Sequence, residues 1–101
     1  MIQNKTYSLL GIAAKAGKTA LGATAVEKTV KSGRSRLVVI ADTASPNTRK
    51  KFENMCTFYK VPFYIFGDAG TLGHAVGSGE HAVIAVLDEG LACAVAKSLE
   101  A

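Results

Sequence analysis

Two uninterrupted apolar segments constrain the fold of this chain more than any other feature. Residues 37–41 and 82–87 are hydrophobic at every position and rich in β-branched side chains. A strand that buries only one face alternates apolar and polar residues, whereas a strand covered on both faces is apolar throughout. The two segments therefore predict strands inside a sheet that carries helices on both faces.

The segments around these two strands alternate between helical and extended patterns. Ser45 followed by Pro46 is a typical helix start, and the buried stripe predicted for that helix consists of Phe52, Met55, Cys56 and Tyr59. The predicted order is helix 6–15 ending at Gly17, strand 19–21, helix 23–32, strand 37–41, the helix opened by Ser45, strand 63–66, a short helix 71–76, strand 82–87 and a helix capped by Asp88. This order predicts a three-layer α/β/α sandwich with a small mixed sheet.

Length and composition indicate one globular domain over residues 1–101. Hydrophobic residues make up 49% of the 101 residues, enough to build a core. The longest apolar run, 82–87, is far shorter than the roughly 20 residues of a membrane-spanning helix, and no signal peptide is visible at the N-terminus. Cys56 and Cys93 lack metal-ligand spacing and are interpreted as buried thiols in a reducing compartment. We therefore expect a cytoplasmic protein without contact to a membrane.

Positive charge is concentrated in the first part of the chain. Residues 1–60 hold eleven of the twelve lysines and arginines and three acids, a net charge of +8, whereas residues 61–101 have a net charge of −4. This asymmetry is typical of a basic face that attracts an anionic polymer. Scattered, solvated lysines would give the same composition, so both interpretations stay open.

One motif is similar to a nucleotide-binding loop. Gly17-Lys18-Thr19 matches the end of the P-loop pattern G-x-x-x-x-G-K-[ST], but five residues instead of four separate Gly11 from Gly17. A P-loop lies between a strand and the helix that follows, whereas here a helix is predicted before the motif and a strand after it. A nucleotide-hydrolysing enzyme is therefore the weakest of the functional hypotheses.

The two histidines do not complete a catalytic or metal site. His74 and His81 flank a glycine-rich loop, and the nearby candidate ligands are Asp68 and Glu80. A zinc site needs a tighter set of ligands, and no serine or cysteine lies in a recognisable nucleophile motif. The sequence predicts no catalytic residue, no metal and no cofactor.

The strongest candidate for a binding site is the turn at Gly22 and the helix that follows. A helix start offers free backbone N–H groups and a positive dipole, which together bind anions. Thr24, Lys28 and Lys31 are spaced to form a polar stripe on one side of that helix, with Lys18 nearby in sequence. An ordinary glycine turn with solvated lysines would explain the same residues.

Several motifs in order resemble a known family. Ala16-Gly17-Lys18, Gly22, Lys28 and residues 33–41 resemble the L-seven-Ae family of ribosomal and kink-turn RNA-binding proteins. Residues 44–51, 61–62, 72–77 and 88–90 are similar to its bacterial YlxQ branch, and the resemblance extends from about residue 7 to residue 97. It implies a three-layer α/β/α domain that is not an enzyme and that binds kink-turns, sharply bent RNA duplexes with sheared G·A pairs.

The resemblance also implies which residues contact RNA. In the family, the glycine turn, the helix start after it and the loop before the last strand meet the RNA, and Lys28 matches a lysine that faces phosphates. The candidate RNA-binding residues are Gly17, Lys18, Gly22, Ala23, Thr24, Ala25, Lys28, Lys31, Gly77, Ser78, Gly79, Glu80 and His81.

The chain differs from the family pattern at two places. Many members carry Asn-Glu, which reads guanine edges, where this chain has Thr24 and Ala25. The loop before the last strand is often apolar, whereas here it is polar and contains Glu80. The main hypothesis is a monomeric, noncatalytic protein that binds structured RNA, with ribosomal RNA or the ribosome as partner. A protein–protein interaction module that kept the fold but lost RNA binding remains the alternative, since it accounts directly for Ala25 and Glu80.

Overall fold

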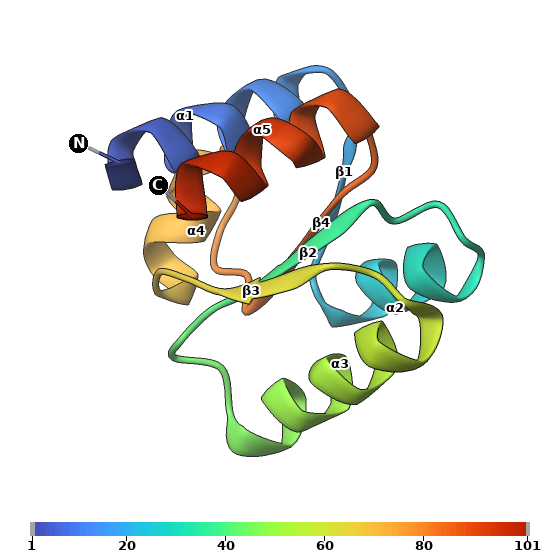
Figure 1. Ribbon diagram of the computed structural model, residues 1–101. Helices are drawn as coiled ribbons and strands as arrows, with labels where there is room; N and C mark the ends of the chain where they lie inside the picture. The colour runs from blue at the N-terminus through green and yellow to red at the C-terminus, as the bar shows by residue number, and fades with distance from the viewer. Residues whose placement is uncertain (1, 101) are drawn as a thin grey trace.

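Five helices and four strands alternate along the described chain (Figure 1). The computed structural model describes the backbone of residues 2–100 and the side chains of residues 5–100. The elements are α1 (Ile2–Lys15), β1 (Thr19–Leu21), α2 (Ala23–Lys31), β2 (Leu37–Ile40), α3 (Pro46–Tyr59), β3 (Phe63–Ile65), α4 (Ala69–Ala75), β4 (Val83–Val86) and α5 (Glu89–Glu100).

The two apolar segments form the inner strands of the sheet. The strand order is β1-β4-β2-β3. β4 pairs antiparallel with both β1 and β2, and β2 pairs parallel with β3, so the sheet is mixed. Every residue of β2 and β4 is buried, as their uninterrupted hydrophobicity predicts.

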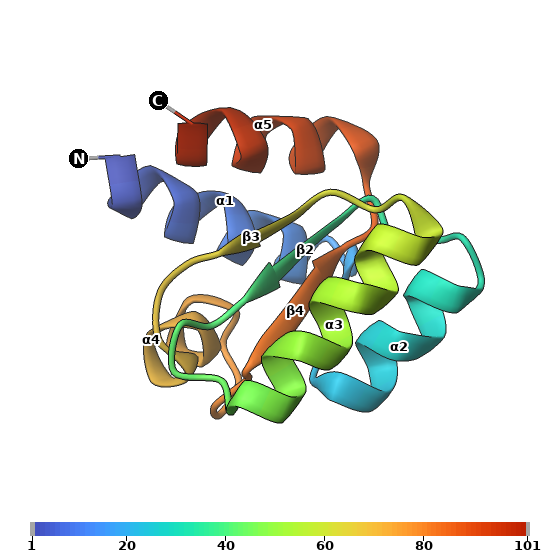
Figure 2. The ribbon, with the colours of Figure 1, turned by 60° about the horizontal axis from the view of Figure 1, so that its bottom comes forward.

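Helices cover both faces of this sheet. α1, α4 and α5 lie on one face, and α2 and α3 lie on the other (Figures 1 and 2). Because successive side chains of a strand point to opposite faces, Leu37 and Val39 pack in the core with Leu10 of α1. Val38 packs in the second core with Phe52 of α3. The predicted three-layer α/β/α sandwich with a small mixed sheet is confirmed.

The helix boundaries follow the expected capping chemistry, with two shifts. The Ser45 hydroxyl accepts a hydrogen bond of 3.2 Å from the backbone N–H of Thr48, so the predicted start of α3 is confirmed. α1 begins at Ile2 rather than residue 6. α4 begins at Ala69 rather than residue 71, because Asp68 is an N-cap whose carboxylate accepts bonds of 2.8 Å from both the N–H and the hydroxyl of Thr71.

Two residues predicted to be buried are exposed. Tyr59 is 41% exposed because α3 ends there and the chain turns at Lys60, in a left-handed conformation (φ 59°), before it enters β3. Cys93 is exposed because α5 turns Ala92 and Val95 toward the core and Cys93 away from it. Cys56 is buried as predicted, and burial raises the pKa of its thiol to about 11. Within the described residues, no helix has the length and hydropathy needed to cross a bilayer.

Candidate nucleic-acid interface

The start of α2 presents uncapped backbone N–H groups. Gly22 is the N-cap residue, and it has φ 90° and ψ 164°, a conformation that strains residues with a side chain. Its N–H donates to the carbonyl of Val83 at 3.0 Å, and its carbonyl accepts the first bond of the helix, from the N–H of Val26 at 3.0 Å. No side chain caps this helix start. The N–H groups of the first turn therefore remain available to an external acceptor.

The loop of residues 77–81, before β4, is held by α4. The N–H of Ser78 donates to the carbonyl of Gly73 at 2.9 Å, and the N–H of His81 donates to the carbonyl of Ala69 at 3.2 Å. Gly73 is so close to the loop that a Cβ atom built there would lie 1.6 Å from the carbonyl oxygen of Gly79. The loop of residues 77–81 is therefore held in a defined position against α4.

The sheet brings this loop next to the start of α2. β1 and β4 are antiparallel with Leu21 opposite Ile84, so the end of β1 meets the beginning of β4. A Cβ atom built at Gly22 would lie 3.8 Å from Nδ1 of His81. We call the combined region the helix-start surface, and its residues are Gly22, Ala23, Thr24, Ala25, Lys28 and residues 77–81.

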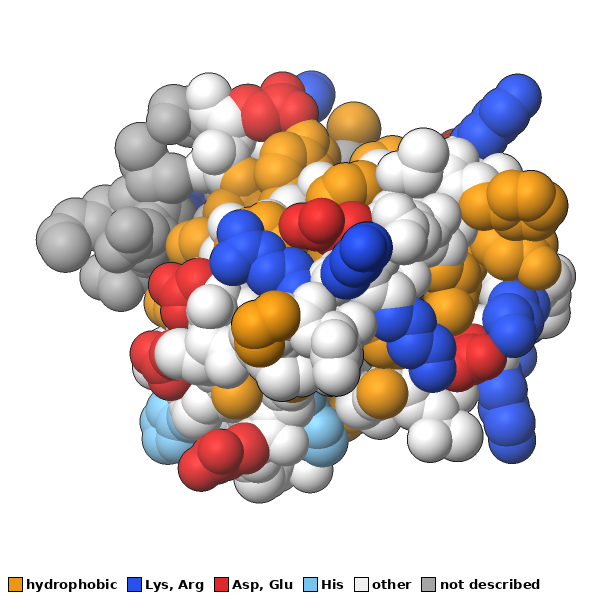
Figure 3. Space-filling view, turned by 90° about the horizontal axis from the view of Figure 1, so that it is seen from below, with side chains coloured by type: hydrophobic (Ala, Val, Ile, Leu, Met, Phe, Trp, Pro, Cys, Tyr) orange, Lys and Arg blue, Asp and Glu red, His pale blue; other side chains and the backbone are white. Residues whose placement is uncertain are grey.

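The lysines of α2 differ in whether they form ion pairs. Lys28 is exposed and forms no ion pair with a described carboxylate. Lys31 pairs with Glu27 at 2.7 Å, and Glu27 also pairs with Lys51 of α3 at 2.9 Å. Figure 3 shows lysine and arginine side chains spread over this side of the molecule, with a few acids among them. The ammonium group of Lys28 is therefore more available than that of Lys31 to an anionic partner.

The ion pairs of Glu27 predict a pH-dependent stability. Hydrogen bonds from Lys31, then from Lys51, lower the pKa of the Glu27 carboxyl from 4.5 to about 2. A carboxyl whose pKa is lower in the folded state stabilises the fold above its unfolded pKa, and this stabilisation is lost as the pH falls through the folded pKa. We expect Glu27→Gln to lower the Tm at pH 7, with the difference from the parent shrinking below pH 4.5 and vanishing near pH 2. Thermal unfolding followed by circular dichroism tests this, and an equal Tm difference at pH 7 and pH 2 would contradict it.

Gly17 and Lys18 do not share the helix-start surface, although they were predicted together with Gly22. The N–H of Lys18 donates to the carbonyl of Ala13 at 2.9 Å, which closes the end of α1. β1 then separates Lys18 from Gly22 by roughly 13 Å, at about 3.3 Å per extended residue. The two residues therefore lie at the other end of the sheet. Their position between a helix and a strand also lacks the strand-then-helix context of a P-loop.

His81 lies in the loop of residues 77–81, and His74 lies in α4. His81 lies near Ser78, with 3.3 Å between Nε2 and the hydroxyl oxygen. Among the described residues, no group of three or more His, Cys, Asp or Glu side chains is arranged to hold a metal ion. Glu80 is exposed in the same loop, so it places one negative charge at the edge of the helix-start surface.

Comparison with known proteins decides the family. The model described as the ribosomal protein L7Ae/L30e/S12e/Gadd45 family matches residues 4–96. The chain belongs to this family. The resemblance found in the sequence is thus confirmed for nearly the whole chain.

Relatives within the L7Ae/L30e/S12e/Gadd45 family support the bacterial branch. The RNA-binding protein YlxQ of Bacillus subtilis is 37% identical, over 85% of this chain and 86% of that protein. The protein of the same name from Enterococcus faecium is 30% identical, over 89% and 86%. The large ribosomal subunit protein eL8 of Thermoplasma volcanium is 31% identical, over 88% and 74%. These names describe RNA-binding and ribosomal proteins, which agrees with the prediction of a noncatalytic protein in the YlxQ branch.

Solved structures share the fold of the chain. A protein of unknown function from Bacillus halodurans superposes with a TM-score of 0.93 at 35% identity, covering 96% of this chain and 98% of that one. The 15.5kD RNA binding protein of Giardia lamblia superposes with a TM-score of 0.84 at 24% identity, covering 98% and 85%. At 24% identity, the similarity to the Giardia lamblia protein supports the fold only.

The sequence did not reveal the close contact at Gly73 or the basic groups at the far end of the sheet. A glycine within a short helix indicates only weak helix propensity. The residues around Gly73 in the sequence give no sign that the carbonyl of a loop residue lies against it. Arg34 and Arg36 follow a glycine turn and precede β2, and they line a common hollow with Lys18. This clustering depends on the pairing of both β1 and β2 with β4.

Proposed function

We propose that this chain is a single RNA-binding domain without catalytic activity, and that it binds a kink-turn-like RNA in association with the ribosome. The observation that carries the proposal is the meeting of the uncapped start of α2 with the loop of residues 77–81. Several RNA-binding and ribosomal relatives support the same class of partner. Association with the ribosome would place the protein in the cytoplasm, and we propose that it acts as a monomer.

The geometry supports a phosphate-binding role for the helix-start surface. The N–H groups of the first turn of α2 point out of the helix, and the positive end of the helix dipole favours an anion there. The φ of Gly22 makes glycine the suitable residue at the turn, and without a side chain it lets a backbone approach closely. Lys28 lies one turn beyond Thr24 on the exposed side of α2. Phosphates could therefore contact the helix start and Lys28 at the same time.

Selectivity would come from the shape of the RNA. Bent RNA places phosphates and 2′-hydroxyls in an arrangement that a straight duplex does not offer. The hydrogen bonds between residues 77–81 and α4 keep the loop beside the helix start in the absence of RNA. The entropic cost of ordering the loop on binding would therefore be small. A fixed two-part surface is suited to recognising such a shape.

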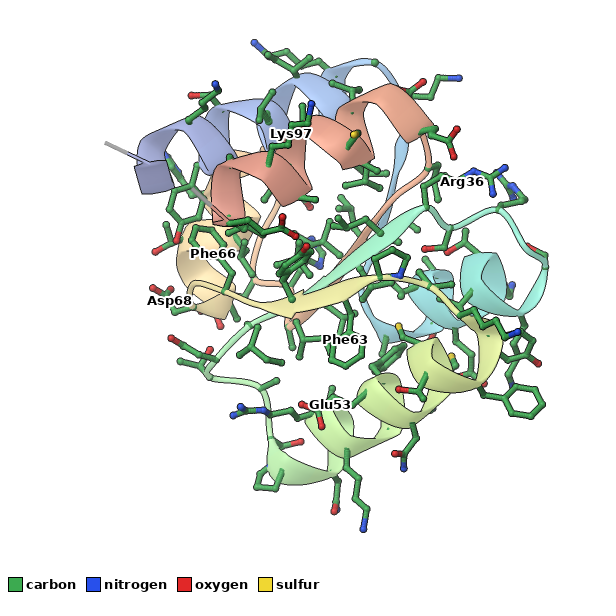
Figure 4. All side chains as sticks on the ribbon, viewed as in Figure 1. Arg36, Glu53, Phe63, Phe66, Asp68 and Lys97 are labelled. Carbon is green, nitrogen blue, oxygen red and sulfur yellow. The ribbon has the colours of Figure 1, made fainter. Side chains whose placement is uncertain are left out.

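Replacing Lys28 tests the proposed contact. We expect Lys28→Ala to weaken binding to a kink-turn RNA and to reduce the slope of log affinity against log salt by about one unit or less, because one phosphate contact is lost. The fold should be unaffected, since Lys28 is exposed and makes no ion pair with a described carboxylate. Lys97→Ala, on α5 in the opposite layer (Figure 4), is the matched control. Equal affinity and slope for the parent and Lys28→Ala would remove Lys28 from the interface.

A protein-binding module is the second candidate function. Glu80 is exposed beside the start of α2, where it would repel phosphates, and Ala25 offers no hydrogen bond to a base edge. A protein partner would tolerate both residues. If the parent chain binds neither kink-turn nor duplex RNA at low salt but still joins ribosomal particles, the second candidate replaces the first.

A further inference from the structure

The end of the sheet opposite the helix-start surface has a distinct composition. β1 and β2 both run antiparallel to β4, and β3 runs parallel to β2, so β1, β2 and β3 share one direction. α2 and α3 each connect two of these strands and consequently run parallel to each other, as Figures 1 and 2 show. Their last turns therefore lie together at the far end of the sheet.

A pair of aromatic rings is exposed at the end of α3. Phe58 is 78% exposed and is the most exposed large hydrophobic side chain of the described residues, and Tyr59 beside it is 41% exposed. The two rings meet edge to face, with 5.0 Å between their centroids. Most other aromatic side chains of this chain are buried or half-buried in the two cores, so this pair stands apart.

Three cations line a hollow at the same end. The hollow has a volume of about 280 Å³ and is lined by Gly17, Lys18, Gly33, Arg34, Arg36 and Leu87. Lys18, Arg34 and Arg36 are exposed, and none of them pairs with a carboxylate of the described residues. Figure 4 labels Arg36 at this end of the molecule.

The aromatic pair and the cations belong to one surface. The N–H of Val38 donates to the carbonyl of Pro62 at 3.0 Å, and Arg36 and Pro62 line a common groove. Pro62 follows Lys60 by two residues, which places the end of α3 beside the beginning of β2. We call this region the basic–aromatic surface: Lys18, Arg34, Arg36, Phe58, Tyr59 and Lys60.

The ion pairs of Glu27 connect α2 with α3. Glu27 of α2 pairs with Lys31 of the same helix at 2.7 Å and with Lys51 of α3 at 2.9 Å, so α2 and α3 lie side by side. Arg34 follows Lys31 by three residues. The arginines can therefore be reached from the aromatic pair along the protein surface.

The acids near this surface do not cancel its charge. Glu89 lines the groove beside Arg36 without pairing with it, and Glu27 is held between Lys31 and Lys51. Cations at helix ends stabilise the negative ends of helix dipoles, which accounts for some of the positive charge. It does not account for the two exposed aromatic rings at the same end of the sheet.

We propose that the basic–aromatic surface binds unpaired nucleotides of single-stranded RNA, as a second contact independent of the helix-start surface. Unpaired bases stack on exposed aromatic rings, and the phosphates between them bind lysine and arginine. The positive charge favours a polyanion over a hydrophobic protein segment as the occupant. A duplex is a poor match, because its bases are already stacked and paired.

The proposal is tested with the full chain and a fluorescein-labelled ten-nucleotide oligouridine at low salt. We expect Phe58→Ala to weaken binding about tenfold, and Arg34→Ser combined with Arg36→Ser to reduce the salt slope by about 1.4. Ile12→Ala, which trims a hydrophobic side chain that is 53% exposed on α1, is the control for Phe58. Lys5→Ser combined with Lys97→Ser is the control for the arginines, and both controls should bind like the parent.

The same variants separate this proposal from the function proposed above. If Phe58→Ala loses oligouridine binding while its affinity for kink-turn RNA is unchanged, the two surfaces act independently. If the parent chain does not bind kink-turn RNA but binds oligouridine in a Phe58-dependent way, the result supports this surface alone. Absence of oligouridine binding by the parent, or equal weakening by Phe58→Ala and Ile12→Ala, overturns the proposal. It is also overturned if Phe58→Ala abolishes capture of a ribosomal protein while oligouridine binding stays unchanged, which would make the surface a protein contact.

Discussion

Replacing Gly73 by alanine is expected to destabilise the fold by about 2–3 kcal/mol and to weaken binding of kink-turn RNA. The added Cβ would lie 1.6 Å from the carbonyl oxygen of Gly79, 2.5 Å from its carbonyl carbon and 2.7 Å from the carbonyl oxygen of Ser78. All three are backbone atoms, so no side-chain rotation relieves the overlap. α4 and the loop of residues 77–81 must move apart, and the loop would leave its place beside Gly22.

Three measurements test the Gly73→Ala prediction. Urea unfolding gives the loss of stability, RNA titration at fixed salt gives the loss of affinity, and hydrogen exchange of the Ser78 amide reports the lost bond to the Gly73 carbonyl. Gly79→Ala is the matched control in the same loop, since a Cβ there meets nothing within 4 Å. That control should change stability by no more than about 0.5 kcal/mol. A Gly73→Ala protein with parental stability and a protected Ser78 amide would show that the contact is not close in solution.

The second large effect expected is a gain of RNA affinity from Thr24→Asn combined with Ala25→Glu. These are the second and third residues of α2, and they match positions where the L7Ae/L30e/S12e/Gadd45 family resemblance implies readout of guanine edges. Thr24 is exposed and Ala25 is half-buried at the edge of the core, so both longer side chains have access to solvent. A paired polar contact to a base is worth roughly 1–3 kcal/mol, a value established for DNA, which corresponds to about 5- to 150-fold in affinity. Glutamate near a helix start is also compatible with the helix dipole.

The control for the double variant is a change in the RNA. When Watson–Crick pairs replace the sheared G·A pairs, the gain should disappear, and the added carboxylate should make binding equal to or slightly weaker than that of the parent. Opposite responses to the two RNAs are the signature of base readout. If the double variant binds both RNAs no better than the parent, the helix start does not read bases, and the protein-interaction hypothesis gains support.

Local chemistry was sufficient to predict most of the architecture. The inner positions of β2 and β4 follow from their uninterrupted hydrophobicity, and the start of α3 follows from Ser45 and Pro46. Each of these features depends on neighbouring residues in the sequence. Tyr59 shows the limit, since its spacing continues the buried stripe of α3 but the core has ended before its position is reached.

The candidate sites depend more on tertiary pairing than the elements do. Gly22 and His81 are 59 positions apart in the sequence, and the register of β1 with β4 makes them neighbours. The same register sends Lys18 to the opposite end, although it is four positions from Gly22 in the sequence. Proximity along the chain groups Lys18 with Gly22, whereas in the fold the length of β1 separates them.

The lengths of the strands have a consequence for association between copies. β1 and β3 form the two edges of the sheet, and each is three residues long, whereas the longer β2 and β4 are enclosed between them. An edge that short offers few unpaired N–H and C=O groups to a strand from another chain. Short edge strands therefore protect the sheet against edge-to-edge pairing with the strands of another copy.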